Sequence, residues 1–318
     1  MVKLEFNKPA FLFPGQGSQY QGMALDLYEE SAGVRDVFAR ASEIFHRDMK
    51  KLLAEAGEDE LKNTEIAQCA VTLANLSSAA FLAERGVRAV CAAGHSLGEY
   101  AALHEAGIIS LDDCFALVRE RGKAMAAHGI SGAGMAAVLG ISPEAVEKLI
   151  NEWSEAGLRG VYAANFNSNR QTVISGTVSA LAEVETRFKE AGARRVLALK
   201  VSGPFHSPLM KEAADAFAAF LQTVHFNEPR IPFFSNVSGK RVTNGAQAKE
   251  YALRQITAPV RWIDEEAEIA AAGIDAALET GPGKALCGLW ADTGSSIPCF
   301  AAGTVAALMG LGGLSKNT

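Results

Sequence analysis

Ser96 is the residue of this sequence best placed to act as a nucleophile. It stands at the centre of the motif G-H-S-L-G at residues 94–98, between an apolar run and an expected helix. In this pattern a serine hydroxyl is exposed at a sharp strand-to-helix turn, and the flanking glycines are needed because a Cβ atom would crowd the turn. We therefore expect nucleophilic catalysis by Ser96; the alternative is a tight-turn serine that caps the following helix.

A nucleophilic serine needs a general base, and His206 is the best candidate among the six histidines. The segment V-S-G-P-F-H-S-P at residues 201–208 predicts a strand end, a rigid turn and a helix start. The imidazole would then lie on a loop at the carboxyl edge of a sheet, where open α/β sheets build their sites. The alternative is a structural histidine with its hydrogen bonds satisfied.

No acid that would complete a catalytic triad is evident. The aspartates between Ser96 and His206 are Asp112 and Asp113, and both belong to an expected helix start with Ser110 as its N-cap. The glutamates of the same interval fall on predicted helices. A dyad in which a backbone carbonyl orients the histidine is the simpler interpretation.

Arg121 is a charged residue on an apolar face. On the expected helix 111–128 it lies within a stripe formed by Leu117, Val118, Ala124 and Met125. A buried guanidinium needs an anionic partner, because leaving it unpaired costs several kcal/mol, roughly. One interpretation is an internal salt bridge. The more specific interpretation is that the guanidinium binds a substrate carboxylate through two parallel hydrogen bonds.

Two glycine motifs resemble nucleotide-binding loops without matching them. G-Q-G at residues 15–17 lacks the third glycine of a dinucleotide fingerprint, and G-P-G-K at residues 281–284 lacks the first glycine of a P-loop. The second predicts a turn that enters a helix. In the first, the N–H of Gln16 is a candidate for an oxyanion hole, since glycines let the backbone approach a reacting carbonyl.

The elements that must position these residues predict an α/β fold. Residues 9–13 and 87–93 are apolar runs without alternation, typical of parallel strands buried on both faces, and helices are expected at 63–85 and 97–106. From residue 132 the order becomes βαββαβ, with strands at 135–140, 161–166, 172–175 and 196–201 and helices at 143–156 and 180–191. That order is the split-βαβ arrangement of ferredoxin-like domains.

Composition excludes several classes of protein. The chain has 318 residues, 49% of them hydrophobic, and a net charge of −6, which argues against nucleic acid as the main partner. Five scattered cysteines without a C-x-x-C pair predict reduced thiols in the cytoplasm. The first residues lack a signal-peptide pattern, and no apolar run approaches the about 18 residues of a membrane span, so no membrane association is expected.

Taken together, these motifs resemble malonyl-CoA:acyl carrier protein transacylases. The resemblance is carried by G-Q-G-S-Q at 15–19, G-H-S-L-G-E at 94–99, R-G-K at 121–123 and G-P-F-H-S at 203–207. It is extended by Gln255 before P-V-R-W at 259–262, and by G-P-G at 281–283. It covers nearly the whole chain in the right order.

The resemblance implies a fold and a set of roles. It implies an α/β-hydrolase-like large subdomain with a parallel sheet, residues 1–131 and 202–318, interrupted by a ferredoxin-like βαββαβ small subdomain, residues 132–201. The roles that it implies are as follows: Ser96 as nucleophile, His206 as base oriented by the main-chain carbonyl of Gln255, Gln16 and Leu97 as oxyanion hole, Arg121 as the clamp for the malonyl carboxylate, and Phe205 as a bulky residue that crowds an α-methyl group.

The resemblance also implies substrates and partners. Malonyl-CoA would be the donor and an acyl carrier protein the acceptor, in fatty acid or polyketide biosynthesis, with no metal or redox cofactor. A cytoplasmic monomer is expected, and Lys189, Arg194 and Arg195 are candidates for a basic docking surface. The alternatives are a hydrolase that edits carrier-protein thioesters, a discrete trans-acting acyltransferase of a polyketide synthase, and a non-catalytic module that docks carrier proteins.

Overall fold

Two four-stranded sheets organise the chain, whose computed structural model describes residues 6–314. The first sheet is parallel and has the order β10 (Cys299–Ala301), β9 (Ala276–Glu279), β1 (Pro9–Phe13) and β2 (Cys91–Gly94). The second is antiparallel, in the order β4 (Val161–Ser168), β5 (Gln171–Thr177), β3 (Ala133–Leu139) and β6 (Arg195–Ala198). A short hairpin joins β7 (Phe234–Ser235) to β8 (Lys240–Arg241). The expected α/β fold class, with a parallel and a separate antiparallel sheet, is confirmed.

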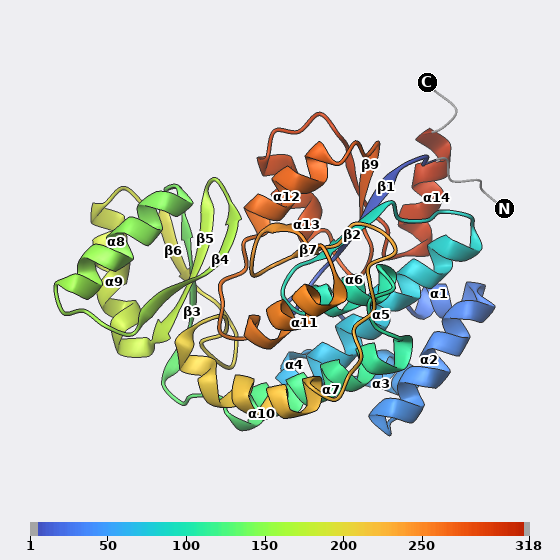
Figure 1. The fold of residues 1–318 in the computed structure, drawn as a ribbon, viewed down its shortest axis with the longest axis horizontal. Coiled ribbons are helices and arrows are strands. Elements are labelled where there is room, and N and C mark those ends of the chain that lie inside the picture. The colour runs from blue at the N-terminus through green and yellow to red at the C-terminus, as the bar shows by residue number, and fades with distance from the viewer. Residues whose placement is uncertain (1–5, 315–318) are drawn as a thin grey trace.

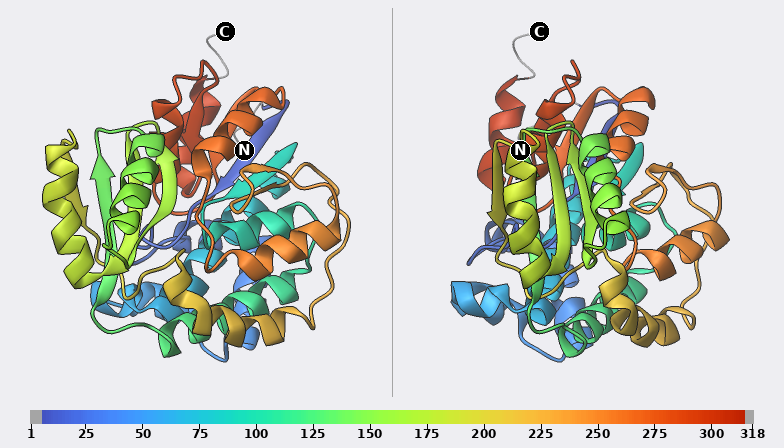
Figure 2. Two further views of the ribbon diagram at one scale, coloured as in Figure 1. Left: turned by 60° about the vertical axis from the view of Figure 1, so that its left-hand side comes forward. Right: turned by 90° about the vertical axis from the view of Figure 1, so that its left-hand side faces the viewer.

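Helices surround the parallel sheet, and two more cover the antiparallel sheet on its outer side (Figures 1 and 2). The antiparallel sheet carries α8 (Pro143–Glu155) and α9 (Val178–Glu190). The N-terminal part of the chain contributes α1 (Leu25–Glu30), α2 (Ala32–Phe45), α3 (Met49–Glu55), α4 (Glu58–Lys62), α5 (Thr64–Glu84), α6 (Gly98–Glu105) and α7 (Leu111–Ala127). The C-terminal part contributes η1 (Pro208–Met210), α10 (Lys211–Leu221), α11 (Gly245–Arg254), α12 (Trp262–Ala271), α13 (Ala285–Asp292) and α14 (Val305–Leu314).

Strand β1 shows why the apolar runs have no alternation. Phe11 and Phe13 point into the large core formed with α2, α5, α6, α7 and α10, whereas Ala10 and Leu12 point into a second core beneath α12 and α13. Every residue of β1 is buried. Because both faces of the strand meet apolar side chains, the sequence has no polar position to mark a solvent side.

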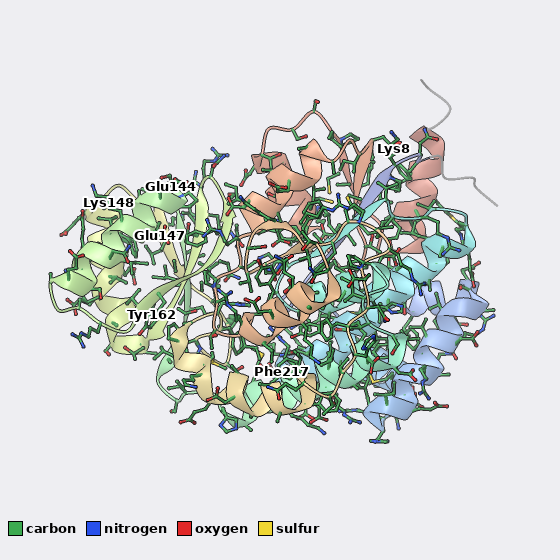
Figure 3. The ribbon with its side chains drawn as sticks, viewed as in Figure 1. Lys8, Glu144, Glu147, Lys148, Tyr162 and Phe217 are labelled. Carbon is green, nitrogen blue, oxygen red and sulfur yellow. The ribbon has the colours of Figure 1, made fainter. Side chains whose placement is uncertain are left out.

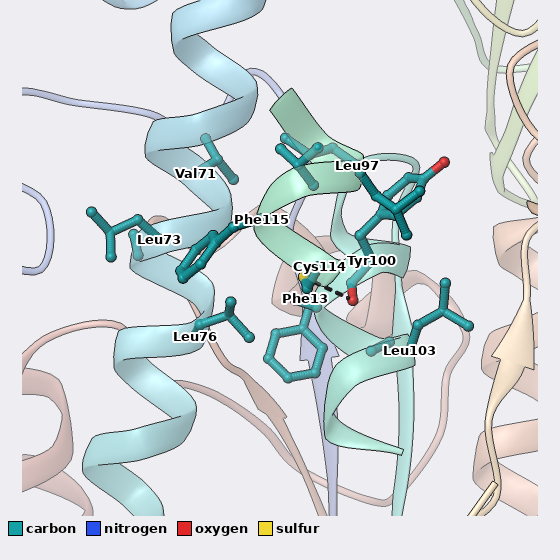
Figure 4. Close-up of a cluster of buried hydrophobic side chains, with 14 of the residues drawn as sticks. Phe13, Val71, Leu73, Leu76, Leu97, Tyr100, Leu103, Cys114 and Phe115 are labelled. Carbon is teal, nitrogen blue, oxygen red and sulfur yellow. Dashed lines mark hydrogen bonds between the residues drawn. The ribbon is translucent and has the colours of Figure 1, made fainter. Parts of the chain in front are cut away.

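Helix α5 lies at the centre of the large core. By length and composition it could cross a membrane, with a mean hydropathy of 1.5, contrary to the expectation that no segment comes near that threshold. In the structure, 83% of the 18-residue window with this hydropathy is buried inside the protein. Val71 and Leu76 lie on the side of α5 that faces Phe115 of α7 in the cluster shown in Figure 4, and Leu73 points to the other side of the helix. The apolar composition of α5 therefore serves the protein core.

Two expected strands are shorter than the apolar runs predicted. In the run 87–93 the paired strand begins at Cys91, opposite Ala10, and just before it the Val90 N–H donates to the carbonyl of Pro9 at 2.9 Å. Pro9 has no N–H of its own to add to the ladder. The strand expected at 196–201 is β6, which pairs with β3 from Arg195 to Ala198 as the edge strand of the antiparallel sheet. The apolar residues left outside these strands extend into loops.

The antiparallel sheet has one face toward α8 and α9 and contributes the other to the large core. Val138 and Ile174 pack under the two helices, while Met135 and Val173 join the large core. On α8 the charged side chains project away from the sheet (Figure 3). All these elements lie within residues 133–198. The division of the chain at residues 132 and 201 stays a prediction.

Glu266, a buried glutamate of α12, makes the stability of the fold depend on pH. Glu266 accepts a hydrogen bond from Trp262 Nε1 at 2.8 Å, and burial raises the pKa of its carboxyl to about 8, from 4.5, despite this bond. The folded state therefore keeps a proton that the unfolded chain releases, so the free energy of unfolding falls as pH rises between these values. Each pH unit in this window costs about 1.4 kcal/mol for such a carboxyl.

We expect Glu266→Gln to flatten this pH dependence. Glutamine keeps the acceptor for Trp262 and removes the titrating group, so the melting temperature should fall less between about pH 6 and about pH 9. Calorimetry at a series of pH values measures the slope. Glu268→Gln, at an exposed position of the same helix, should leave the slope unchanged. Equal slopes for the two variants would contradict the role given to Glu266.

Candidate active site

Ser96 lies at the sharp turn between β2 and α6, in a left-handed backbone conformation with φ of 51°. The glycines on both sides permit this turn. A Cβ on Gly94 would lie 2.1 Å from the carbonyl of Gly98, and a Cβ on Gly98 would lie 2.0 Å from the carbonyl oxygen of Phe13. The motif is therefore a packing requirement between β1, β2 and α6, and it lifts the serine side chain out of the turn.

Substitution of Gly98 tests this packing. We expect Gly98→Ala to lower the free energy of unfolding by about 3 kcal/mol or more, because the methyl group meets backbone atoms rather than a movable side chain. Urea denaturation measures the change. Gly288→Ala in α13, where nothing lies within 4 Å of the added carbon, should be neutral or stabilising by up to about 1 kcal/mol. Similar values for both variants would refute the steric account.

His206 lies within hydrogen-bond distance of Ser96. Its Nε2 is 2.6 Å from Ser96 Oγ, and its Nδ1 is 3.0 Å from the carbonyl oxygen of Gln255 and 3.2 Å from that of Ala258. A carbonyl oxygen can only accept, so Nδ1 carries the proton and Nε2 is left to accept the serine hydroxyl. The second carbonyl, of Ala258, had no signal in the sequence.

The position of His206 in the fold differs from the expected one. The preceding strand, β6, ends at Ala198 and belongs to the antiparallel sheet, so the histidine does not follow a strand of the parallel sheet. It lies instead in a left-handed conformation with φ of 57°, and its N–H donates to Ile256 at 3.1 Å. A loop between the two sheets thus brings the imidazole to the edge where β2 ends.

The environment of His206 keeps the imidazole neutral. Burial, together with the nearby Arg121 charge, lowers its pKa to about 3, although the carbonyl of Gln255 opposes this shift. A neutral imidazole is the form that can accept a proton from a serine hydroxyl. The base form therefore prevails at physiological pH.

Gln255 joins the groups of the site. Besides its carbonyl contact with His206, its side-chain Nε2 donates to the Ser96 carbonyl at 2.8 Å and to the carboxylate of Glu99. Its Oε1 accepts from Arg121 Nη2 at 3.1 Å. The residue is 1% exposed. The resemblance assigned a role only to its main-chain carbonyl, whereas the structure shows contacts from both its backbone and its side chain.

Arg121 is buried without a carboxylate partner. It is 1% exposed, and its recorded hydrogen bonds go to the amide oxygens of Gln68, at 2.8 Å, and Gln255. Its Nε has no hydrogen-bond partner within the described part of the chain, where no salt bridge to Arg121 is found either. The internal salt bridge considered from the sequence is thus not formed there. Two of its five donors are used, and the others can bind an anion.

Glu99 is an acidic residue whose charge acts on this guanidinium, and burial disfavours its charged form. It is buried, accepts the N–H of Asn236 at 3.0 Å and contacts Gln255. Burial raises the pKa of its carboxyl to about 7, against the effect of these hydrogen bonds. Glu99 is the last residue of the motif G-H-S-L-G-E, but no role was predicted for it from the sequence. Asn236 and Gln68, which contact the same network, lie outside the motifs, and nothing in their local sequence marks them.

Gln16 and Leu97 lie on the two loops that meet at the end of β1 and β2. Phe13 pairs with Gly94, and the backbone of Gly15 approaches the carbonyl of His95 so closely that a Cβ would lie 2.5 Å from it. Within residues 6–314 neither the Gln16 nor the Leu97 N–H has a recorded acceptor. Leu97 is the N-cap of α6. Both amides therefore lack an acceptor among the described residues, and their role as the oxyanion hole stays a prediction.

A cavity of about 1010 Å³ opens beside this edge of the sheet. It is lined by the Gln16 loop, by His95, by the start of α13, and by Lys62 and Lys200 from the two sides. His95 Nε2 is 2.8 Å from Asn167 Oδ1 in its wall. Within the described residues no group of three His, Cys, Asp or Glu side chains could hold a metal ion.

The remaining candidates lie farther from these contacts. Phe205 is 7% exposed and belongs to the large core, next to His206 in the chain, and its effect on acyl-group size stays a prediction. Lys189 pairs with Glu185 on α9, and Arg195 begins the edge strand β6. Their role in docking a partner, like that of Arg194, stays a prediction.

Comparison with known proteins places the chain in a family. Residues 10–316 match the acyl transferase domain model. The malonyl CoA-acyl carrier protein transacylase of Bacillus subtilis is 39% identical over 284 residues, 89% of each chain, and that of Escherichia coli K12 is 39% identical over 282 residues, 88% of this chain and 91% of that protein.

Solved structures agree. An acyl carrier protein S-malonyltransferase from Vibrio cholerae superposes with a TM-score of 0.91 at 37% identity, covering 96% of this chain and all of that one. A malonyl-transacylase in complex with its type II polyketide synthase acyl carrier protein gives a TM-score of 0.91 at 34% identity, over 98% of this chain and 100% of that one. With fold, motif order and sequence in agreement, this chain belongs to the acyl transferase family of the malonyl CoA-acyl carrier protein transacylases.

Proposed function

We propose that the protein transfers the malonyl group of malonyl-CoA to the phosphopantetheine thiol of an acyl carrier protein, through a malonyl ester of Ser96. One observation carries this proposal: a serine–histidine pair and a buried arginine without a carboxylate partner are joined through a single residue, Gln255. The serine and histidine perform acyl transfer, and the arginine selects an acyl group that bears a carboxylate.

In the first half-reaction His206 Nε2 accepts the Ser96 proton while Oγ attacks the thioester carbonyl. The N–H groups of Gln16 and Leu97 hold the resulting oxyanion, and one such donor contributes about 2.7–4 kcal/mol in serine hydrolases. The carbon–sulfur bond breaks, and the CoA thiolate leaves with the proton of His206. The carrier thiol then attacks the ester by the reverse path, which regenerates Ser96. This ping-pong sequence needs no metal and no redox cofactor.

Arg121 is assigned to the free carboxylate of the malonyl group. Its unused donors form a fork that matches two carboxylate oxygens. The same pairing fixes the acyl group and helps to keep water from a productive approach to the ester. All five cysteines are free, which fits a protein of the reducing cytoplasm, where we place this reaction.

Rapid mixing with malonyl-CoA tests the proposal. Release of one equivalent of CoA, followed by further release only when a carrier protein is added, is the expected result. Continuous release without a carrier would identify an editing hydrolase instead, and no release would identify a non-catalytic docking module. Transfer assays against a panel of fatty acid and polyketide carrier proteins then identify the pathway.

A further inference from the structure

The side chain of Asn236 lies behind Ser96 and holds the backbone on both sides of it. Asn236 follows β7 and is fully buried. Its Oδ1 accepts the N–H of Ser96 at 2.8 Å, and its Nδ2 donates to the carbonyl of Gly94, also at 2.8 Å. One amide thus ties the last residue of β2 to the serine two positions later.

Every hydrogen-bonding group of Asn236 is used. Nδ2 also donates to Glu265 Oε1 at 2.8 Å, the main-chain N–H donates to Glu99, and the carbonyl accepts from the N–H of Arg261 at 2.9 Å. A buried amide with all its partners in place has a single favourable orientation. The side chain is therefore a rigid brace between β2, α6 and α12.

We propose that Asn236 is a positioning residue that keeps Ser96 in the left-handed conformation required for its contact with His206. This inference rests on the proposed role of Ser96. A non-glycine residue with positive φ persists only where its surroundings hold it, and Asn236 supplies the bond to its N–H. The same bond occupies the N–H of Ser96, so the next amide, that of Leu97, is the one left for an oxyanion.

Single-turnover acylation tests the brace. Asn236→Ala should lower the rate constant for formation of malonyl-Ser96 by about 10- to 100-fold, since a small displacement of a reacting atom is enough for such a loss. The KM for malonyl-CoA should change less than about threefold. Ser78→Ala, which removes another buried hydrogen bond, to the carbonyl of Ala302, should leave the rate constant unchanged.

A second variant keeps the test decisive if Asn236→Ala does not fold. Asn236→Asp preserves the side-chain volume and the acceptor for the Ser96 N–H, but it loses both donated hydrogen bonds. Its acylation rate constant should fall measurably, by about threefold or more, and less than that of Asn236→Ala. Acylation at the unaltered rate in a folded variant would overturn the role of Asn236 and leave the proposed function intact. Absence of an adduct on Ser96 in the unaltered protein would instead refute the proposed function itself.

A different observation concerns two cysteines outside the catalytic network. Cys287 in α13 and Cys299 in β10 carry their sulfur atoms 3.1 Å apart, and both are partly exposed, whereas Cys69, Cys91 and Cys114 are buried. This separation needs only a small movement to reach a sulfur–sulfur bond. Solvent access at both residues allows an oxidant to reach them.

We infer that Cys287 and Cys299 form a peroxide-sensitive thiol pair. Hydrogen peroxide would oxidise one thiol to a sulfenic acid and be reduced to water. The second thiol would displace the sulfenic hydroxyl, forming the disulfide and releasing a second water. Cys287 lies between Leu286 and Gly288, which line the cavity beside the Gln16 loop, so this bond would fix the start of α13 to β10 next to that cavity.

Mass spectrometry tests the pair. After treatment with stoichiometric peroxide, the intact protein should lose two hydrogen atoms, and peptide mapping should recover the Cys287–Cys299 linkage, reversible by dithiothreitol. Cys287→Ser and Cys299→Ser should each abolish this product, while Cys114→Ser should not. The inference is overturned if the peroxide-treated protein, once unfolded, still has five thiols that can be alkylated. A linkage between other cysteines would overturn it as well.

Discussion

Ser96→Ala is expected to abolish formation of the malonyl-enzyme and to reduce transfer to the carrier protein by about 10⁶-fold, the loss seen when a serine nucleophile is removed elsewhere. In the proposed mechanism the hydroxyl oxygen is the attacking atom, and neither His206 nor the proposed oxyanion donors can replace it. Intact mass measurement after mixing with malonyl-CoA shows the adduct directly. The fold should be retained, because Asn236 binds the main chain of residue 96 and not its hydroxyl.

His206→Ala provides the comparison within the dyad. This variant keeps the nucleophile and removes its base, so slow acylation of Ser96 should still be detectable on long incubation. In Ser96→Ala no acylation should be detectable at all. Ser42→Ala, at a hydroxyl that donates to the carbonyl of Phe38 within α2, controls for loss of an unrelated serine. A malonyl adduct of unchanged yield in Ser96→Ala would remove Ser96 from the mechanism.

The sequence predicted those features that depend on local backbone chemistry. The elbow around Ser96 needs two glycines where backbones touch, and the N-cap Ser110 accepts a backbone N–H at the helix start where it was expected. Arg121 was predicted to be buried because its position within an apolar stripe is a property of one helix. Such features leave a pattern within a few residues of chain.

Features that depend on distant parts of the chain left no such pattern. Asn236 and Gln68 reach the site from β7 and α5, and each looks like an ordinary polar residue in its own segment. Where a strand begins depends on the strand that pairs with it, so the apolar run 87–93 predicted a longer strand than β2. The role of Gln255 as the common partner of Ser96, His206 and Arg121 required coordinates, since its local sequence indicates only a helix end.

Arg121→Ala is expected to lower malonyl transfer by about 10²–10³-fold while acetyl transfer or hydrolysis falls much less, or rises. Removing one partner of a buried, hydrogen-bonded charge pair costs about 2–5 kcal/mol or more, and only the malonyl group has a carboxylate to form that pair. Measuring kcat/KM for malonyl-CoA and acetyl-CoA with the same carrier protein gives the ratio. Lys123→Ala, at an exposed position on the same helix, should leave both values unchanged.

The ratio separates substrate recognition from damage to the site. Arg121 also binds Gln68 and Gln255, so its loss disturbs the network around Ser96 and His206 and should lower both activities to some extent. Only the lost carboxylate contact discriminates between the two donors. Arg121→Lys keeps the charge but loses the planar fork, and it should recover part of the malonyl preference. An equal loss for malonyl and acetyl donors in Arg121→Ala would show that the guanidinium supports the network without binding the substrate carboxylate.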